Sequence, residues 1–503
     1  MNTAPVLEIP ETLARGYPQI RDSESEFVGA PLAKTFPTSA SVRQTNSLSQ
    51  ISKQSIRTSL RASTMDGVFA NIFSSITSGV LLTNFLLQLG ATPVEIGLLS
   101  SIPLLMNFLQ PLGAHFADRT TSRHWYILAV FGPSRLLWLI LVAGIAWFSC
   151  CDTDSHQLVG WTLGIIFITN LLGALGSCAW FSWMAALVPQ RLRGRYFGFR
   201  NSAASLTNLL CTPLLGFAVM AWPGGSIQGY GVLLLVGVAI GLVSLGCQFW
   251  MTDVNSQANC ATKSLVSQKQ TTHSEYEGRG IFKDSNFLKF LLYIGLWTFA
   301  VNLSSPFFNL YMLKNLGLDL STVTVYTGLL SAANLVMLVF WGRIADRIGN
   351  RPLLLLTGVL IAVTPLLWLG AGSDFISLWV WLPLIHLVCG GLGAAIDLCN
   401  NNIQMEVAPK NRPSQYFAIA AAVSGISGGV GATVGGFFAG LDVISGLPGL
   451  FALSTVLRLV ALLPLVFVRE PRSQPIIQLV QNIPVLKLRL APVSVARIVQ
   501  PRG

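Results

Sequence analysis

The chain has 503 residues, of which 52% are hydrophobic and only 11% are charged, and its formal net charge is +11. Its mean hydropathy is +0.60. Soluble domains carry about 25% charged residues, so this composition excludes an ordinary soluble enzyme or binding protein and indicates a membrane protein.

Residues 1–60 are rich in Ser, Thr, Pro and Gln, which is typical of a disordered cytoplasmic tail. After them come long apolar segments, each near the length of about 20 residues that a helix needs to cross a bilayer. The runs are continuous rather than alternating, which favours helices over strands. We expect twelve membrane helices: 64–88, 94–115, 125–148, 159–187, 200–222, 229–252, 286–313, 321–344, 352–371, 376–405, 414–442 and 446–468.

The predicted fold is therefore an all-α integral membrane protein with two six-helix halves. Its predicted parts are an N-terminal tail (1–60), a first half (61–252), a cytoplasmic linker (253–285), a second half (286–468) and a cytoplasmic C-terminal tail (469–503).

Two charged connections of the same shape lie between apolar segments. One reads Gly-Arg-Ile-Ala-Asp-Arg-Ile-Gly-Asn-Arg over 342–351, and the other reads Ala-His-Phe-Ala-Asp-Arg-Thr-Thr-Ser-Arg over 114–123. Asp346 follows Asp118 by 228 residues, nearly half of the chain. The Pro, Tyr and Phe of segment 189–197 also recur, 220 residues later. These repeats predict two copies of one membrane unit that point the same way through the bilayer.

The pattern Gly-x-x-x-Asp-Arg-x-Gly-x-Arg resembles the signature between helices 2 and 3 in the major facilitator superfamily. The copy at 342–351 is nearly complete, whereas the other has Ala114 and Thr121 in place of two glycines. The resemblance covers residues 61–469 and implies the twelve-helix fold of that family, with a conformational latch that holds the halves together while the cavity faces outward. The implied latch residues are Asp118, Arg119, Gly342, Asp346, Arg347, Gly349 and Arg351.

Cations concentrate in the connections that follow even-numbered helices, namely Arg119, Arg123, Arg191, Arg193, Arg195, Arg343, Arg347, Arg351, Lys410 and Arg412. The connections after odd-numbered helices carry Lys314 beside several acids. Short positively charged loops stay on the cytoplasmic side, so both termini are predicted to be cytoplasmic, in the inner or plasma membrane of the cell. The same bias explains the net charge, which therefore gives no support to nucleic-acid binding.

In the family that the chain resembles, helices 1, 4, 7 and 10 line a central cavity. Helical spacing independently places polar residues on one face of each of these segments. The candidate cavity residues are Asp66, Thr77, Asn84, Asn170, Ser177, Phe181, Asn302, Ser305, Asn309, His386, Asp397, Asn400 and Gln404. Lipid offers polar groups no partners, so these stripes indicate a wet, substrate-binding cavity; the alternative is hydrogen bonding between helices.

Asp397 lies on the same helical face as His386, about three turns away. Ionisable residues inside a membrane are costly and often functional, so Asp397 is a candidate proton carrier. The alternative is a structural hydrogen bond from Asp397 to Asn401 or to a neighbouring helix.

Further charges within the predicted helices include Asp66, Arg135 and Arg458. Asp66 is a cavity candidate or the partner of Arg61 in an ion pair at a helix end. Arg135 and Arg458 lie in helices that are peripheral in the family, so we expect them to pair with helix ends or lipid headgroups. Several glycines between 425 and 440 predict close approach of the eleventh helix to a neighbour.

The sequence therefore predicts a secondary active transporter that works by alternating access, with protons as a candidate coupling ion. A second possibility is a non-transporting membrane protein of the same fold that acts as a sensor or assembly factor.

No catalytic triad, metal-ligand spacing or phosphate-binding loop is present, so neither an enzyme nor a cofactor is expected. The expected partners are a small-molecule substrate and the lipid bilayer, and the expected state is a monomer. The few cavity charges argue against strongly ionic substrates, whereas a sugar, a drug-like amphiphile or a metabolite would fit.

Overall fold

The computed structural model describes residues 53–120, 122–150, 156–188, 193–253, 284–407, 413–441 and 446–469. Within these ranges, twelve helical segments are long and apolar enough to cross a membrane. This confirms the predicted all-α fold of twelve spans. The predicted tails before residue 53 and after residue 469, and most of the predicted linker (254–283), lie outside the described residues.

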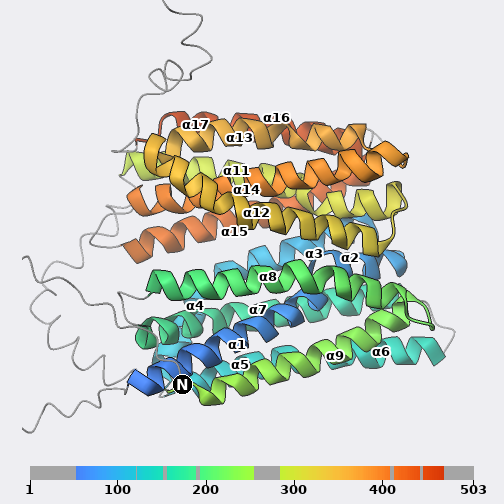
Figure 1. The fold of residues 1–503 in the computed structure, drawn as a ribbon, viewed down its shortest axis with the longest axis vertical. Helices are drawn as coiled ribbons and strands as arrows, with labels where there is room; N and C mark the ends of the chain where they lie inside the picture. The colour runs from blue at the N-terminus through green and yellow to red at the C-terminus, as the bar shows by residue number, and fades with distance from the viewer. Residues whose placement is uncertain are drawn as a thin grey trace, which may run out of the picture. The chain divides into compact units, whose positions relative to one another are not determined.

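The first six spans are formed by α1 (Lys53–Thr77), α2 (Gly79–Gln88), α3 (Pro93–Met106), α4 (Gln110–Arg119), α5 (Arg123–Leu136), α6 (Trp138–Cys150), α7 (Gln157–Leu187), α8 (Arg193–Met220) and α9 (Ser226–Cys247). The last six are formed by α11 (Ser285–Leu310), α12 (Leu320–Ile348), α13 (Asn350–Leu367), α14 (Leu382–Val407), α15 (Pro413–Ala439), α16 (Leu447–Ala461) and α17 (Leu463–Val466). Figure 1 shows these two groups, coloured blue to green and yellow to red, as two helical layers.

The first span starts at Lys53, earlier than the predicted residue 64 and inside the segment expected to be a tail. Its first turns are polar, so hydropathy underestimates the length of the helix. Contacts with other spans stabilise these turns: Ser59 is fully buried with its Oγ 3.1 Å from Thr252 Oγ1, and Ser63 Oγ donates to Met184 Sδ.

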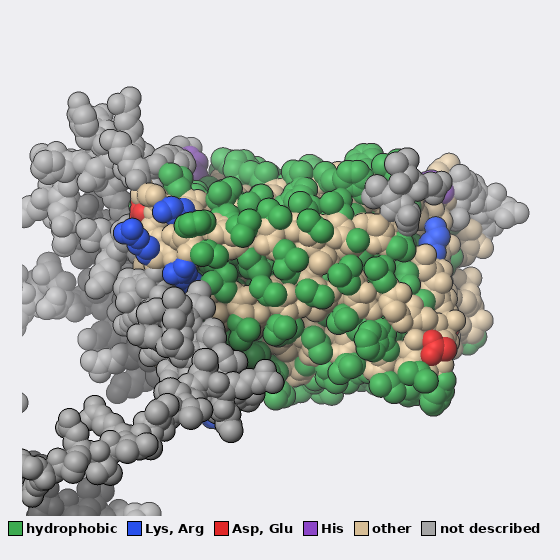
Figure 2. Space-filling model, turned by 90° about the horizontal axis from the view of Figure 1, so that it is seen from above, with side chains coloured by type: hydrophobic (Ala, Val, Ile, Leu, Met, Phe, Trp, Pro, Cys, Tyr) green, Lys and Arg blue, Asp and Glu red, His purple; other side chains and the backbone are tan. Residues whose placement is uncertain are grey.

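The spans run between a basic end and an acidic end. The basic end is where α1 begins and carries Arg343, Arg347 and Arg351, whereas the acidic end carries Asp319 and Asp374. Figure 2 shows a hydrophobic surface between these ends, with most of the visible Lys and Arg side chains gathered at the left. This is the surface of a protein that spans a bilayer.

The two halves pack against each other through α3 on α15 and α8 on α12. A Cβ built on Gly97 of α3 would lie 3.1 Å from Gly436 Cα of α15, and one built on Gly216 of α8 would lie 2.5 Å from Thr324 Oγ1 of α12. All four residues lie near the acidic end. The glycines of the eleventh span thus permit the expected close approach, and the two halves are in close contact at the acidic end.

Candidate central cavity

Two cavities lie between the helices and meet at Gly79 and Asn309, which line both. The first cavity has a volume of about 660 Å³ and is lined mainly by the first four spans together with α11. The second cavity has a volume of about 330 Å³ and is lined mainly by α11, α13 and α14. Their junction is formed by the first and seventh spans, two of the four that the resemblance assigns to the central cavity.

A break in the first span shapes this junction. The helix stops at Thr77 and restarts at Gly79, with Ser78 in an extended conformation (φ −152°) and Gly79 at φ +66°. A positive φ is strained for residues other than glycine, so Gly79 permits the break. Irregular backbone is tolerated at membrane depth only where it is buried in protein or lines a cavity, which is the situation here.

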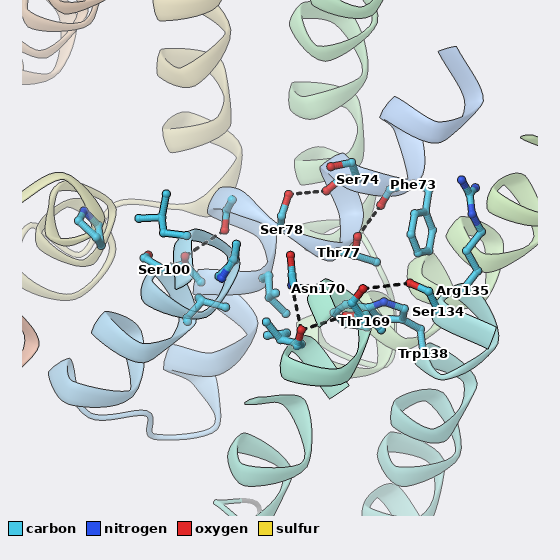
Figure 3. A pocket seen from close by; sticks show the side chains of 18 of the residues that line it. Phe73, Ser74, Thr77, Ser78, Ser100, Ser134, Arg135, Trp138, Thr169 and Asn170 are labelled. Atoms are coloured by element: carbon cyan, nitrogen blue, oxygen red, sulfur yellow. Dashed lines mark hydrogen bonds between the residues drawn. The ribbon is translucent and has the colours of Figure 1, made fainter. Parts of the chain in front are cut away.

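Hydroxyl and amide side chains cover much of the first cavity. They are Ser74, Thr77, Ser78, Thr83, Ser100, Ser134, Thr169, Asn170, Asn302 and Asn309. Figure 3 shows several of them donating to backbone carbonyls, as Thr77 Oγ1 does to Phe73 O at 3.0 Å and Asn170 Nδ2 to Ile166 O at 2.9 Å. A hydroxyl that donates in this way still has acceptor lone pairs, so the wall can accept hydrogen bonds from a polar solute.

Aromatic rings, a histidine and an arginine form much of the second cavity. Phe308 stacks on Trp368 with ring centroids 4.6 Å apart, and His386 contacts the edge of Trp368 at 5.4 Å. His386 Nδ1 lies 2.8 Å from Leu382 O of its own helix. Arg458 also lines this cavity and is 3% exposed.

The positions of the two deep arginines correct our expectation that they would meet helix ends or headgroups. Arg135 lines the first cavity, donates to Gly241 O of α9 and lies over the Phe73 ring at 5.2 Å. Arg458 lines the second cavity and donates to carbonyls within the second half. The expectation was wrong because buried carbonyls on neighbouring helices bind these guanidinium groups far from the lipid headgroups.

Six of the thirteen predicted cavity residues line a cavity: Thr77, Asn170, Asn302, Ser305, Asn309 and His386. The other seven line neither cavity: Asp66, Asn84, Ser177, Phe181, Asp397, Asn400 and Gln404.

Asp66 instead belongs to the packing of the first half. It is 3% exposed, and its Oδ1 accepts hydrogen bonds from Ser244 Oγ at 2.6 Å and Gln248 Nε2 at 3.3 Å. The expected partner Arg61 makes no ion pair with it among the described residues. Asn84 is buried in α2 because the break at Gly79 changes the direction of the helical face after Thr77.

The remaining residues lie nearer the basic end. Asp397 is eleven residues beyond His386, about 16 Å along the helix. Its side chain is exposed and makes no hydrogen bond with Asn401 or any other described residue. Asn400 Oδ1 accepts from Tyr293 OH at 3.0 Å, and Ser177 Oγ donates to Ala174 O at 3.0 Å. These two therefore form structural hydrogen bonds.

The predicted latch residues lie at the basic end. Asp346 and Arg347 are exposed, and Asp346 makes no hydrogen bond or ion pair with any described residue. Arg351 donates to Val466 O within the second half. Gly349 ends α12 at φ +93°. The side chains of Asp118 and Arg119 lie outside the described residues, so the latch remains a prediction.

Comparisons with known proteins agree with this architecture. The family model described as Major Facilitator Superfamily matches residues 67–432 and 286–496. A crystal structure of a D-xylose-proton symporter is similar with a TM-score of 0.62 and 16% identity, covering 83% of this chain and 99% of that one. The inward-open structure of the xylose transporter XylE from E. coli is similar with a TM-score of 0.58 and 15% identity, covering 84% of this chain and 99% of that one.

The crystal structure of nucleoside transporter NupG gives a TM-score of 0.57 and 13% identity, covering 81% of this chain and 98% of that one. No curated protein sequence matches significantly. These structural similarities concern the fold, while the family model covers most of the sequence. The chain, an integral multi-pass membrane protein, therefore belongs to the major facilitator superfamily.

Proposed function

We propose that the chain is a secondary active transporter that moves a small polar solute across the membrane by alternating access. The observation that carries this proposal is a hydroxyl-rich cavity at the junction of two halves that are in close contact at the acidic end. A central site that is closed on one side is the intermediate that rocking of two repeats requires. By the positive-inside rule, the basic end faces the cytoplasm and this state faces inward.

Proton coupling is part of the proposal, with Asp397 as the carrier. Its carboxylate is exposed, has no hydrogen-bond partner among the described residues and lies on the face of α14 that also carries His386. In the inward-facing state such a group can release its proton to water at the basic end. In the outward-facing state, binding of a proton would neutralise the Asp397 carboxylate. The neutral side chain would then ease the change of the protein through its closed conformation.

A disulfide across the closed end tests alternating access. Ser101 Oγ of α3 and Thr433 Oγ1 of α15 are 2.7 Å apart and belong to opposite halves. In protein without other cysteines, Ser101→Cys with Thr433→Cys should form a disulfide that stops solute exchange, and reduction should restore it. The assay is exchange of a metabolite extract across proteoliposomes, followed by mass spectrometry.

The matched control is a disulfide within one half. Ser59 and Thr252, whose hydroxyl oxygens are 3.1 Å apart, both belong to the first half, so Ser59→Cys with Thr252→Cys should leave exchange intact. Exchange that survives the lock between halves, or fails to saturate, contradicts alternating access. Binding of solutes without exchange would indicate a sensor.

A further inference from the structure

We infer that the transported solute carries an oxyanion, a carboxylate or a phosphate, and that this group binds in the second cavity with Arg458 as its counter-charge. The inference rests on the proposed transport function and adds the chemical class of the substrate. It reverses the sequence-based expectation that the cavity disfavours ionic solutes.

Arg458 is a buried cation without an acidic partner. Its Nη1 donates to Ile361 O at 3.1 Å, and its Nη2 to Ser304 Oγ at 3.0 Å and Val301 O at 3.4 Å. No carboxylate lies within ion-pair distance of it in the part of the chain that the structure describes. Buried charges in membrane proteins are normally paired, so this guanidinium lacks the partner that would offset its desolvation.

Two hydrogen-bond donors in the cavity wall also lack partners. Arg458 Nε and Trp368 Nε1 are buried and make no hydrogen bond with any described residue. Both side chains line the second cavity. Buried donors are normally satisfied, so two unpartnered N–H groups on side chains that line one cavity point to a ligand with several acceptor oxygens. An oxyanion offers these oxygens together with the missing negative charge.

The anchoring of Arg458 follows from the sequence of α13. Pro365 has no N–H, so the carbonyl of Ile361, four residues earlier, lacks its normal helical donor. Thr364 Oγ1 and Arg458 Nη1 supply donors instead. Thr364 already satisfies that carbonyl without a charge, so the carbonyl alone does not require a guanidinium.

The first cavity differs because its arginine has an acid nearby. Arg135 interacts electrostatically with the buried Asp66 carboxylate of the same half. None of the side chains that line the second cavity is acidic. The charge of the combined cavity is therefore concentrated in the second half. A solute would place its anionic group beside Arg458 and its hydroxyl groups in the larger first cavity, through the junction at Gly79 and Asn309.

Cys389 provides a probe, because its side chain also lines the second cavity. In full-length protein whose seven other cysteines are Ser, we would compare two thiol reagents of similar size. One is the anionic sulfonatoethyl methanethiosulfonate and the other the cationic trimethylammonioethyl methanethiosulfonate. Each rate at Cys389 is divided by the rate of the same reagent with a small thiol in solution. After this correction the anionic reagent should react about tenfold faster than the cationic one, since a cleft of one charge concentrates counter-ions.

Arg458→Gln should remove this preference, and Arg458→Lys should retain it. The matched control is Arg200→Gln, which removes a guanidinium of the first half that also donates to a backbone carbonyl, Ser63 O. It should leave the preference at Cys389 unchanged. Equal rates of the two reagents, or a preference that survives in folded Arg458→Gln, overturn the inference.

A second measurement keeps Arg458 intact. D-Gluconate and D-glucose 6-phosphate should slow labelling of Cys389 by neutral methyl methanethiosulfonate, and the uncharged D-glucitol should not. Protection by gluconate alone identifies a carboxylate site, and protection by the phosphate alone identifies a phosphate site. Equal protection by glucitol, or none by either anion, overturns the inference. Labelling does not require transport, so failure of solute exchange would be detected separately.

Discussion

Gly97→Ala should shift the protein from the state closed at the acidic end toward the state open there. The added Cβ would lie 2.7 Å from Ala432 O and 3.1 Å from Gly436 Cα, both backbone atoms of α15 in the opposite half. Backbone cannot rotate away as a side chain can, so α3 and α15 must separate. Overpacking of this kind costs about 1–3 kcal/mol.

Only the state with a closed acidic end bears that cost. The better helix propensity of Ala, about 1 kcal/mol, applies equally to both states and cancels. A difference of 1–3 kcal/mol changes the ratio of the two states by about 5–150-fold. Spin labels at Ala221→Cys and Asn315→Cys, which are exposed near the acidic end in opposite halves, would report the shift as a longer interlabel distance.

The matched control is Gly431→Ala on the same helix. A Cβ there meets the backbone carbonyl of Phe299 in α11, which belongs to the same half as α15. This overlap is present in both states, so Gly431→Ala should lower the melting temperature without changing the distance distribution. The reasoning is refuted if folded Gly97→Ala leaves the distance unchanged, or if Gly431→Ala lengthens it equally.

Three further changes have defined outcomes. Asp397→Asn should abolish accumulation driven by a proton gradient while exchange at equal pH survives, because the amide cannot release a proton; unchanged accumulation would make Asp397 structural. Asp66→Ala should lower the unfolding free energy by about 2–3 kcal/mol, measured by thermal unfolding in detergent, since it leaves buried donors unsatisfied. Hydrogen bonds from Ser377 lower the pKa of the Asp374 carboxyl outside the membrane, so Asp374→Ala should be destabilising at pH 7. That difference in melting temperature should disappear as pH falls through the lowered pKa, because the native carboxylate then protonates; a difference that persists in acid contradicts it.

Much of the fold was predictable because the bilayer imposes one length scale on every span. Hydropathy placed the helices within a few residues wherever both ends of a span are apolar, as for Leu447–Val466, which was predicted as 446–468. It failed at Lys53, where polar turns are stabilised by contacts with other helices. Helical periodicity found Thr77 and Asn309 because each shares an uninterrupted helix with its neighbours.

Periodicity failed for Asn84 because it applies to a continuous helix, and the first span is interrupted between Thr77 and Gly79. The adjacent Ser78 and Gly79 are a recognised cause of kinks and were the signal in the sequence that indicated this break.

The cavity role of Arg458 was missed for another reason. Pro365 predicts that a carbonyl of its own helix lacks a backbone donor. The side chain that donates to this carbonyl belongs to a helix about ninety residues away, so its identity depends on how the helices pack.

The two deep arginines bridge equivalent helices from opposite sides. Arg135 lies in the third span and donates to Gly241 O in the sixth, whereas Arg458 lies in the twelfth and donates to Ile361 O in the ninth. In the repeat, the third span is equivalent to the ninth and the sixth span to the twelfth. The two arginines therefore lie on helices that are not equivalent, and an alignment of the two halves does not place one on the other. Each half nevertheless holds a cation between the same two helices beside the central cavity. Since Asp66 accompanies only the first, the two halves present different charge to one solute, and an anionic solute would bind in a single orientation with its charge toward the second half.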